Sequence, residues 1–106
     1  MRYVILRHSR CNEDLHWDLM LEDGQVLKTF RLEVGPADFS KEPIKAVAIR
    51  DHLLKFLDYQ GPVNNGLGEV AAADKGQYQM LKHTRETMEI AFDGQVLRNE
   101  FVFFFN

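Results

Sequence analysis

Short stretches in which apolar and polar residues alternate recur along the chain and predict β-strands, because successive side chains of a strand point to opposite faces. The clearest stretch is His16–Glu22, where Trp17, Leu19 and Leu21 share one face and more polar residues occupy the other. Asp23–Gly24 follows directly and is typical of a hairpin turn, since glycine accepts the positive φ that such turns require. The segment therefore predicts a strand followed by a tight hairpin.

The same criteria, apolar patterns and turn residues, predict the elements of the rest of the chain. Residues 52–59 are apolar and precede Gly61–Pro62, which predicts a helical turn or an irregular segment. Residues 61–68 are rich in glycine and asparagine and predict a loop. Turns are expected at Lys75–Gly76 and Asp93–Gly94. Further strands are predicted at residues 1–7, 25–32, 44–50, 69–73, 77–83, 86–92 and 95–105.

About eight short strands with almost no helix predict an all-β fold, either an antiparallel barrel or a sandwich. Closure into a barrel would also protect the apolar strand Phe101–Phe105, which is an aggregation hazard as a free edge. We therefore predict a small antiparallel β-barrel.

Size and composition limit the class of protein. The 106 residues suit one domain, which we expect to span residues 1–106, and 45% of them are hydrophobic, which excludes a disordered chain. A formal net charge of −3 argues against a free-standing, non-specific nucleic-acid binder. Cys11 is the only cysteine, so no intrachain disulfide can form. Residues 1–10 resemble neither a signal peptide nor a membrane span, and we expect a soluble, cytoplasmic protein with no membrane partner.

The densest group of polar residues is His8, His16 and Asp18. His16 and Asp18 are two positions apart on a predicted strand, so their side chains share a face at a spacing of about 6.7 Å. His8 lies at the end of the preceding predicted strand and would complete a set of two histidines and one carboxylate that holds a divalent cation with open positions. Such ligands suit Mn²⁺, Zn²⁺ or Fe²⁺. Solvated or mutually hydrogen-bonded side chains are the alternative interpretation.

Other polar residues are further candidates for a functional site. His52 would serve as a proton donor to a leaving oxygen or as a phosphate ligand, and a buried, hydrogen-bonded histidine is the alternative. Arg7, Arg10 and Arg31 are candidates for binding an anion, and Arg50 is another arginine of this kind. Taken singly, each is more typical of a solvated surface charge.

The order of the motifs is more specific than any one of them. His8 precedes HWDLMLE at residues 16–22, DGQVLK at 23–28, Gly35–Pro36, IKAVAIRDH at 44–52, a glycine-rich loop with DKGQY at 74–78, and DGQVLRNEFVF at 93–103. This order resembles the 3′-phosphoesterase domain of bacterial DNA ligase D over essentially the whole chain. The family pattern has a histidine, then His-Tyr-Asp-x-Arg-Leu-Glu, a Lys-Gly-Pro, an Asp-His-Pro and a Gly-rich loop that ends in Trp-Asp-x-Gly.

The resemblance implies a small β-barrel with a Mn²⁺-dependent site in its mouth, Zn²⁺ or another divalent cation being an alternative. Such domains remove 3′-phosphates and 3′-terminal ribonucleotides from DNA ends and leave a 3′-hydroxyl. His8, His16 and Asp18 match the metal ligands of the family, and His52 matches its additional active-site histidine. The partners implied are DNA 3′ ends, or a small phosphate ester, and other repair proteins.

The chain also departs from the family pattern. Met20 stands in place of an arginine that would hold the phosphate, and Phe56 in place of a tyrosine. Further departures are Leu6 for glutamine, Val34 for lysine, Ile44 for arginine, and a His8–His16 gap that is two residues longer than usual. These changes predict a weakened or altered phosphoesterase activity. A non-catalytic metal-binding barrel that docks a partner or a nucleic-acid end is the second reading, and a barrel without metal is the third.

Overall fold

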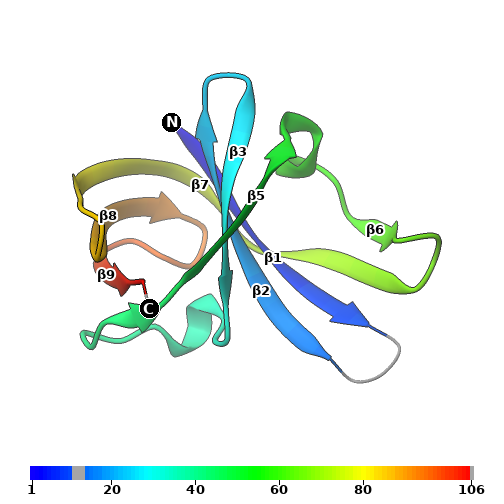
Figure 1. The fold of residues 1–106 in the computed structure, drawn as a ribbon, viewed down its shortest axis with the longest axis horizontal. Coiled ribbons are helices and arrows are strands. Elements are labelled where there is room, and N and C mark those ends of the chain that lie inside the picture. Colours follow the sequence, from blue (N-terminus) through cyan, green and yellow to red (C-terminus); the bar gives the residue numbers. More distant parts are fainter. Residues whose placement is uncertain (11–13, 106) are drawn as a thin grey trace.

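The computed structural model describes residues 1–10 and 14–105, and Cys11 lies outside the described residues. Nearly all regular structure is β-strand, with two short 3₁₀ turns, η1 (Pro36–Asp38) and η2 (Leu54–Leu57) (Figure 1). The strands are β1 (Arg2–Arg10), β2 (Leu15–Asp23), β3 (Val26–Leu32), β4 (Ile44–Lys45), β5 (Val47–Leu53), β6 (Gly61–Val63), β7 (Gly68–His83), β8 (Thr87–Gly94) and β9 (Glu100–Phe104). In this part of the chain, no helix is long and apolar enough to cross a membrane.

The strands form one strongly bent sheet in the order β4-β9-β8-β7-β1-β2-β3-β5, with β6 paired to β7. All pairs are antiparallel except β4–β9, which is parallel. The path starts at β4 and ends at β5, two strands separated in the sequence by Ala46 alone. The chain itself therefore links the two ends of the sheet, and hydrogen bonds do not close it among the described residues. The all-β prediction is confirmed, whereas "barrel" describes this open sheet imprecisely.

The predicted turn at Lys75–Gly76 is wrong, because β7 continues through both residues. The first part of β7 pairs with β1 and its second part with β8, and Gly76 lies opposite both Tyr3 and Gly94. A Cβ atom at Gly76 would lie 2.3 Å from the carbonyl oxygen of Asp93. The glycine therefore allows two neighbouring strands to approach closely, which the sequence alone does not distinguish from a turn.

The predicted strand at 95–105 is shorter in the structure, where β9 begins only at Glu100. The preceding segment is held as a loop by the carboxylate of Asp74, which is 1% exposed. Its Oδ1 accepts hydrogen bonds from the backbone N–H groups of Lys75 (2.9 Å) and Val96 (2.8 Å), and its Oδ2 accepts from Leu97 (3.1 Å). The hydroxyl of Tyr3 also donates to Oδ2. Asp74 thus fixes the β8–β9 loop against β7 and β1.

Strands β1 and β2 are buried on both faces, with one apolar cluster against each face. As predicted, Leu19 and Leu21 lie in the larger cluster with Trp17 packed against it, and Met20 lies on the opposite face. The smaller cluster consists of Val4, Leu6, Met20, Leu27, Leu57 and Val70. The candidate ligands occupy the same face of β1 and β2 as this smaller cluster.

Candidate metal centre and adjoining cavity

The pairing of β1 with β2 brings the three predicted ligands together. His8 lies directly opposite His16 in the antiparallel register, and Leu6 lies opposite Asp18. Directly opposite side chains share a face of the sheet, as do residues two positions apart on one strand. His8, His16 and Asp18 therefore project from one face, in agreement with the spacing argument made from the sequence.

The ligand atoms of these residues all lie within 4.8 Å of one another. His8 Nδ1 is 3.1 Å from His16 Nε2, Asp18 Oδ2 is 3.7 Å from His8 Nδ1, and Asp18 Oδ1 is 3.5 Å from His16 Nε2. Two ligand atoms that are each about 2.1 Å from one cation, at angles of about 90–120°, lie about 3.0–3.6 Å apart. The observed spacings are close to this range, so the three residues fit a single divalent cation.

Burial favours the neutral form of both histidines. The side chains of His8, His16 and Asp18 are nearly withdrawn from solvent, at 8%, 5% and 4% exposure. Burial lowers the pKa of His8 and of His16 below the ordinary histidine value, and the nearby carboxylate of Asp18 opposes this shift only in part. Neutral imidazoles keep the lone pairs that a metal requires.

Three buried side-chain atoms in this region lack a hydrogen-bond partner among the described residues, namely His8 Nε2, Asp18 Oδ1 and Arg31 Nε. Asp18 Oδ1 has no hydrogen-bond partner among the described residues, although it is fully buried. Its nearest cationic neighbour is Arg31 Nε, at 3.9 Å. An unsatisfied buried carboxylate oxygen is unfavourable, and a bound cation would satisfy it. The donor set and this orphaned oxygen both support the fit to a divalent ion.

The glycine-rich loop also contributes to the position of His8. Gly68 begins β7 opposite Arg10, and a Cβ atom there would lie only 3.0 Å from His8 Nε2. The absence of a side chain at Gly68 therefore leaves room for the imidazole, whose Nδ1 faces His16. The sequence predicted a loop over residues 61–68, whereas residues 61–63 form β6 and Gly68 begins β7, and the contact of Gly68 with a ligand was not predicted.

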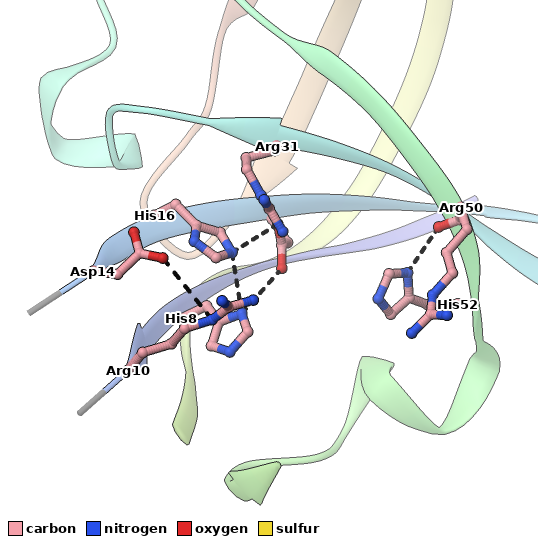
Figure 2. A network of polar contacts seen from close by, with 8 residues as sticks. His8, Arg10, Asp14, His16, Arg31, Arg50 and His52 are labelled. Atoms are coloured by element: carbon pink, nitrogen blue, oxygen red, sulfur yellow. Dashed lines mark hydrogen bonds and ion pairs between the residues drawn. The ribbon is translucent and has the colours of Figure 1, made fainter. Parts of the chain in front are cut away.

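Beside the three residues lies a cavity of about 480 Å³. Figure 2 shows His8, His16 and Arg31 on one side of this region and Arg50 with His52 on the other. His8 and Asp18 line the cavity, whereas His16 is not part of its lining. The remaining polar lining residues are Arg10, Arg31, Arg50, His52 and Asn64.

An irregularity in β5 directs its side chains into this cavity. His52 pairs with Leu27 and Ile49 with Thr29, so the two intervening residues of β5 face a single residue of β3. Such a bulge redirects side chains, and here Ile49, Arg50 and His52 all line the cavity. The sequence made Arg50 a candidate for binding an anion but could not place it in the cavity, because periodicity alone does not reveal a bulge.

The proton position on His52 follows from its hydrogen bond. His52 Nδ1 lies 3.0 Å from the carbonyl oxygen of Arg50. A carbonyl accepts only, so Nδ1 carries the hydrogen and donates it. In the neutral ring, Nε2 then keeps its lone pair.

The four arginines considered from the sequence separate into two groups. Arg10, Arg31 and Arg50 line the cavity. Arg10 lies 3.9 Å from Asp14, while Arg50 forms no ion pair with any other described residue. Arg7 is exposed and, being adjacent to His8 on β1, projects from the opposite face. The structure therefore does not bring Arg7 to the site.

The structure adds Asn64 to the cavity lining, a residue that the sequence argument did not single out. Asn64 follows β6 and has a positive φ of 54°.

The positions that depart from the family pattern also fall into two groups, one inside the cavity lining and one outside it. Leu6, Met20 and Phe56 line the cavity, whereas Val34 and Ile44 lie elsewhere, Ile44 in the larger core. The longer gap between His8 and His16 leaves their pairing intact. The strand ends beyond this pair are joined by a backbone hydrogen bond of 2.9 Å from Arg10 to Asp14.

The fold and the site together define a class of all-β domain in which two histidines and an aspartate lie beside a cavity. Residues 7–104 match the model of the DNA ligase D 3′-phosphoesterase domain, and the chain belongs to that family. It is also similar to the multifunctional non-homologous end joining protein LigD of Pseudomonas aeruginosa, with 30% identity over 105 residues. That match covers 92% of this chain but only 12% of the relative, so the chain spans a small part of the protein it resembles.

Proposed function

We propose that this chain is a metal-dependent phosphoesterase that removes a 3′-phosphate or a 3′-terminal ribonucleotide from DNA ends. The observation that carries the proposal is the convergence of His8, His16 and Asp18 at one side of a cavity that also holds His52 and three arginines. Membership of the family supports the same reaction class.

In this proposal His8, His16 and Asp18 hold one divalent cation, with Mn²⁺ as the ion expected and Zn²⁺ as the alternative. A bound cation would polarise the phosphate and lower the pKa of a water molecule that attacks phosphorus. Asp18 supplies the oxygen ligand, and the guanidinium of Arg31 lies beside it, with Nε 3.9 Å from Oδ1.

The arginines would replace the phosphate-binding arginine of the family pattern. Arg10 and Arg31 lie on the metal side of the cavity, and Arg50 reaches it from β5. Because Arg50 is free of ion pairs with described residues, its guanidinium is available for an anion. Charge-assisted hydrogen bonds from such groups stabilise the charge that develops on a phosphoryl group.

His52 would exchange a proton with the substrate. Its Nδ1 is engaged by the Arg50 carbonyl, so Nε2 is the nitrogen that faces a reaction partner. When protonated, Nε2 donates to the leaving oxygen, and the fixed Nδ1 hydrogen bond keeps the ring oriented. Loss of His52 should therefore slow the reaction without preventing the binding of a cation.

Phosphate release from a 3′-phosphorylated primer-template, with and without Mn²⁺, tests this function. We expect release only with the added metal, and a rate at least 100-fold lower for His52→Ala. His83→Ala is the matched control, because His83 is exposed and lies outside the cavity. Metal-independent release, or equal rates for both variants, would contradict the proposal.

A second function is favoured by Met20 and Phe56, which make part of the cavity apolar where the family pattern has polar groups. A domain with this cavity would bind a metal and a DNA end without cleaving it. Mn²⁺ binding together with no phosphate release from wild type would support this alternative. In either case the 3′ end is the substrate of polymerases and ligases, and repair proteins of these classes are the partners we expect.

A further inference from the structure

The cavity is larger than a phosphate group needs. Its volume of about 480 Å³ lies within the range of about 300–1,000 Å³ that is typical of sites for small organic molecules. A phosphate held beside His8 and Asp18 would occupy only one side of it. The remaining space has room for another part of a ligand.

That remaining space is bounded largely by apolar side chains. They come from five segments of the chain, namely β1, β2, β5 with η2, β6 and β7. The apolar lining residues are Leu6, Met20, Ile49, Phe56, Val63 and Val70. Met20 is 2% exposed and belongs to the smaller core cluster, against which Phe56 packs. Leu6 and Val70 belong to the same cluster, and Val63 also packs against it. Together with Ile49, these side chains form what we call the apolar wall.

The aromatic members of this region have edge-to-face contacts that keep their position. The ring of Phe56 lies 5.7 Å from that of His52 and 5.6 Å from that of Tyr59, both nearly perpendicular. Packing of this kind is typical of preorganised aromatic side chains. A flat ring of a ligand would find an apolar surface here, with charged groups only at the two sides of the cavity.

On the basis of the proposed function, we propose that the cavity accepts a phosphate monoester that carries an aromatic ring, with the ring against Met20, Ile49 and Phe56. The phosphate would lie beside His8 and Asp18, and Arg50 would face it from β5. A terminal nucleotide and a small aryl phosphate share this chemistry. Specificity would then come from the apolar wall as much as from the arginines.

Two phosphonates that resist hydrolysis separate recognition from catalysis. Phenylphosphonate and methylphosphonate share the anionic group and differ in the ring, and their dissociation constants are measured by calorimetry with saturating Mn²⁺. Burial of one ring against apolar side chains predicts at least ten-fold tighter binding of phenylphosphonate. Equal affinities would overturn the inference while leaving the phosphoesterase assay unaffected. Binding of neither compound would overturn it as well.

Substitutions of cavity residues test where the aromatic ring of the ligand binds. Ile49→Gln should reduce the preference for phenylphosphonate at least three-fold and leave the affinity for methylphosphonate unchanged. Leu53→Gln on the same strand is the control, because Leu53 is 62% exposed and lies outside the cavity lining. Met20→Leu should keep the preference, since it keeps an apolar side chain. An unchanged preference in Ile49→Gln, with thermal unfolding like wild type, would overturn the inference.

Cytidine 3′-monophosphate, titrated without metal to prevent turnover, distinguishes the two sources of the ring. If cytidine 3′-monophosphate binds more tightly than phenylphosphonate, both measured without metal, the apolar wall is assigned to a nucleobase. Weaker binding would assign it to a simple aryl group, provided that the phenyl preference over methyl holds.

Discussion

His8 and His16 are opposite residues of two antiparallel strands, and their facing ring nitrogens lie 3.1 Å apart. If both nitrogens were unprotonated, two lone pairs would face each other, an arrangement that a cation between them relieves. Strand register alone produces this contact. It is therefore insensitive to the length of the connection between the strands, including the two extra residues that distinguish this chain from the family pattern.

The first prediction concerns cation binding. Mn²⁺ at 100 times its dissociation constant should stabilise the wild-type fold by about 2.7 kcal/mol, because a ligand that binds only the folded state shifts the unfolding equilibrium. His16→Ala should remove this gain, and His83→Ala should keep it. Thermal unfolding with Mn²⁺, with Zn²⁺ and with a chelator measures the effect. Equal stabilisation of wild type and His16→Ala would contradict the assignment of ligands.

The hairpin of β1 and β2 shows what the sequence could predict. Alternation in residues 16–22 correctly separated Trp17 from His16, and strand pairing then placed His8 beside its two partners. The same alternation separates Arg7 from His8, although proximity in the sequence had suggested a shared role. Neighbours on a strand face opposite sides, so distance along the chain is a poor guide to a common site.

Features that depend on long-range packing could not be predicted from local sequence patterns. The bulge that brings Arg50 into the cavity exists only through the pairing of β5 with β3. Gly76 looked like a turn residue, yet it allows β7 to lie close to β8. Asp74 gave no local sign that it would bind a loop more than 20 residues away. Each of these depends on strand partners that periodicity does not specify.

Arg50 should bind anions and Arg7 should not. Arg50→Ala removes a guanidinium that lines the cavity and lacks an ion pair among the described residues, so we expect phosphate affinity to fall about ten-fold. Arg7→Ala is a matched control on the opposite face of β1. Titration with inorganic phosphate in the presence of Mn²⁺ measures both. A similar loss in the two variants would indicate a general effect of net charge instead of a specific contact.

Asp74 should be important for stability and not for chemistry. Asp74→Asn replaces one carboxylate oxygen by an NH₂ group that cannot accept hydrogen bonds, while the Tyr3 hydroxyl and three N–H groups still require an acceptor. We expect the free energy of unfolding to fall by about 2–4 kcal/mol. Asp93→Asn, at an exposed position of β8, should change it by less than about 0.5 kcal/mol. Chemical denaturation of both variants tests the difference.

The pair of Arg2 and Glu22 should make stability depend on acid pH. Glu22 accepts hydrogen bonds from the Arg2 side chain at 3.1 and 2.6 Å, and these contacts lower the pKa of Glu22 to about 2. A lowered pKa in the folded state means that the contribution is complete above the unfolded value near 4.5 and is lost as the pH falls toward 2. The difference in stability between wild type and Glu22→Gln should therefore shrink between pH 5 and 2, which urea unfolding at several pH values would show. A constant difference over this interval would contradict the assignment.

The last prediction concerns the apolar wall. Met20 follows Asp18 by two residues and lines the cavity from the same face of β2. Met20→Arg would place a guanidinium beside the proposed phosphate position, at the point where the family pattern has arginine. We expect a higher affinity for methylphosphonate, a smaller preference for phenylphosphonate, and faster phosphate release with Mn²⁺ if the chain is an enzyme, because a new charge-assisted contact is worth about 1.5–3 kcal/mol.

Because Met20 is buried, its replacement must be separated from a loss of folding. Thermal unfolding of Met20→Arg is compared with that of Met20→Leu, which keeps the apolar wall, and a lower melting temperature with tighter methylphosphonate binding would still meet the prediction. A folded Met20→Arg that binds both phosphonates as wild type does would show that position 20 does not face the ligand. Tighter binding without phosphate release in any variant would instead favour a domain that binds DNA ends and leaves their cleavage to other proteins.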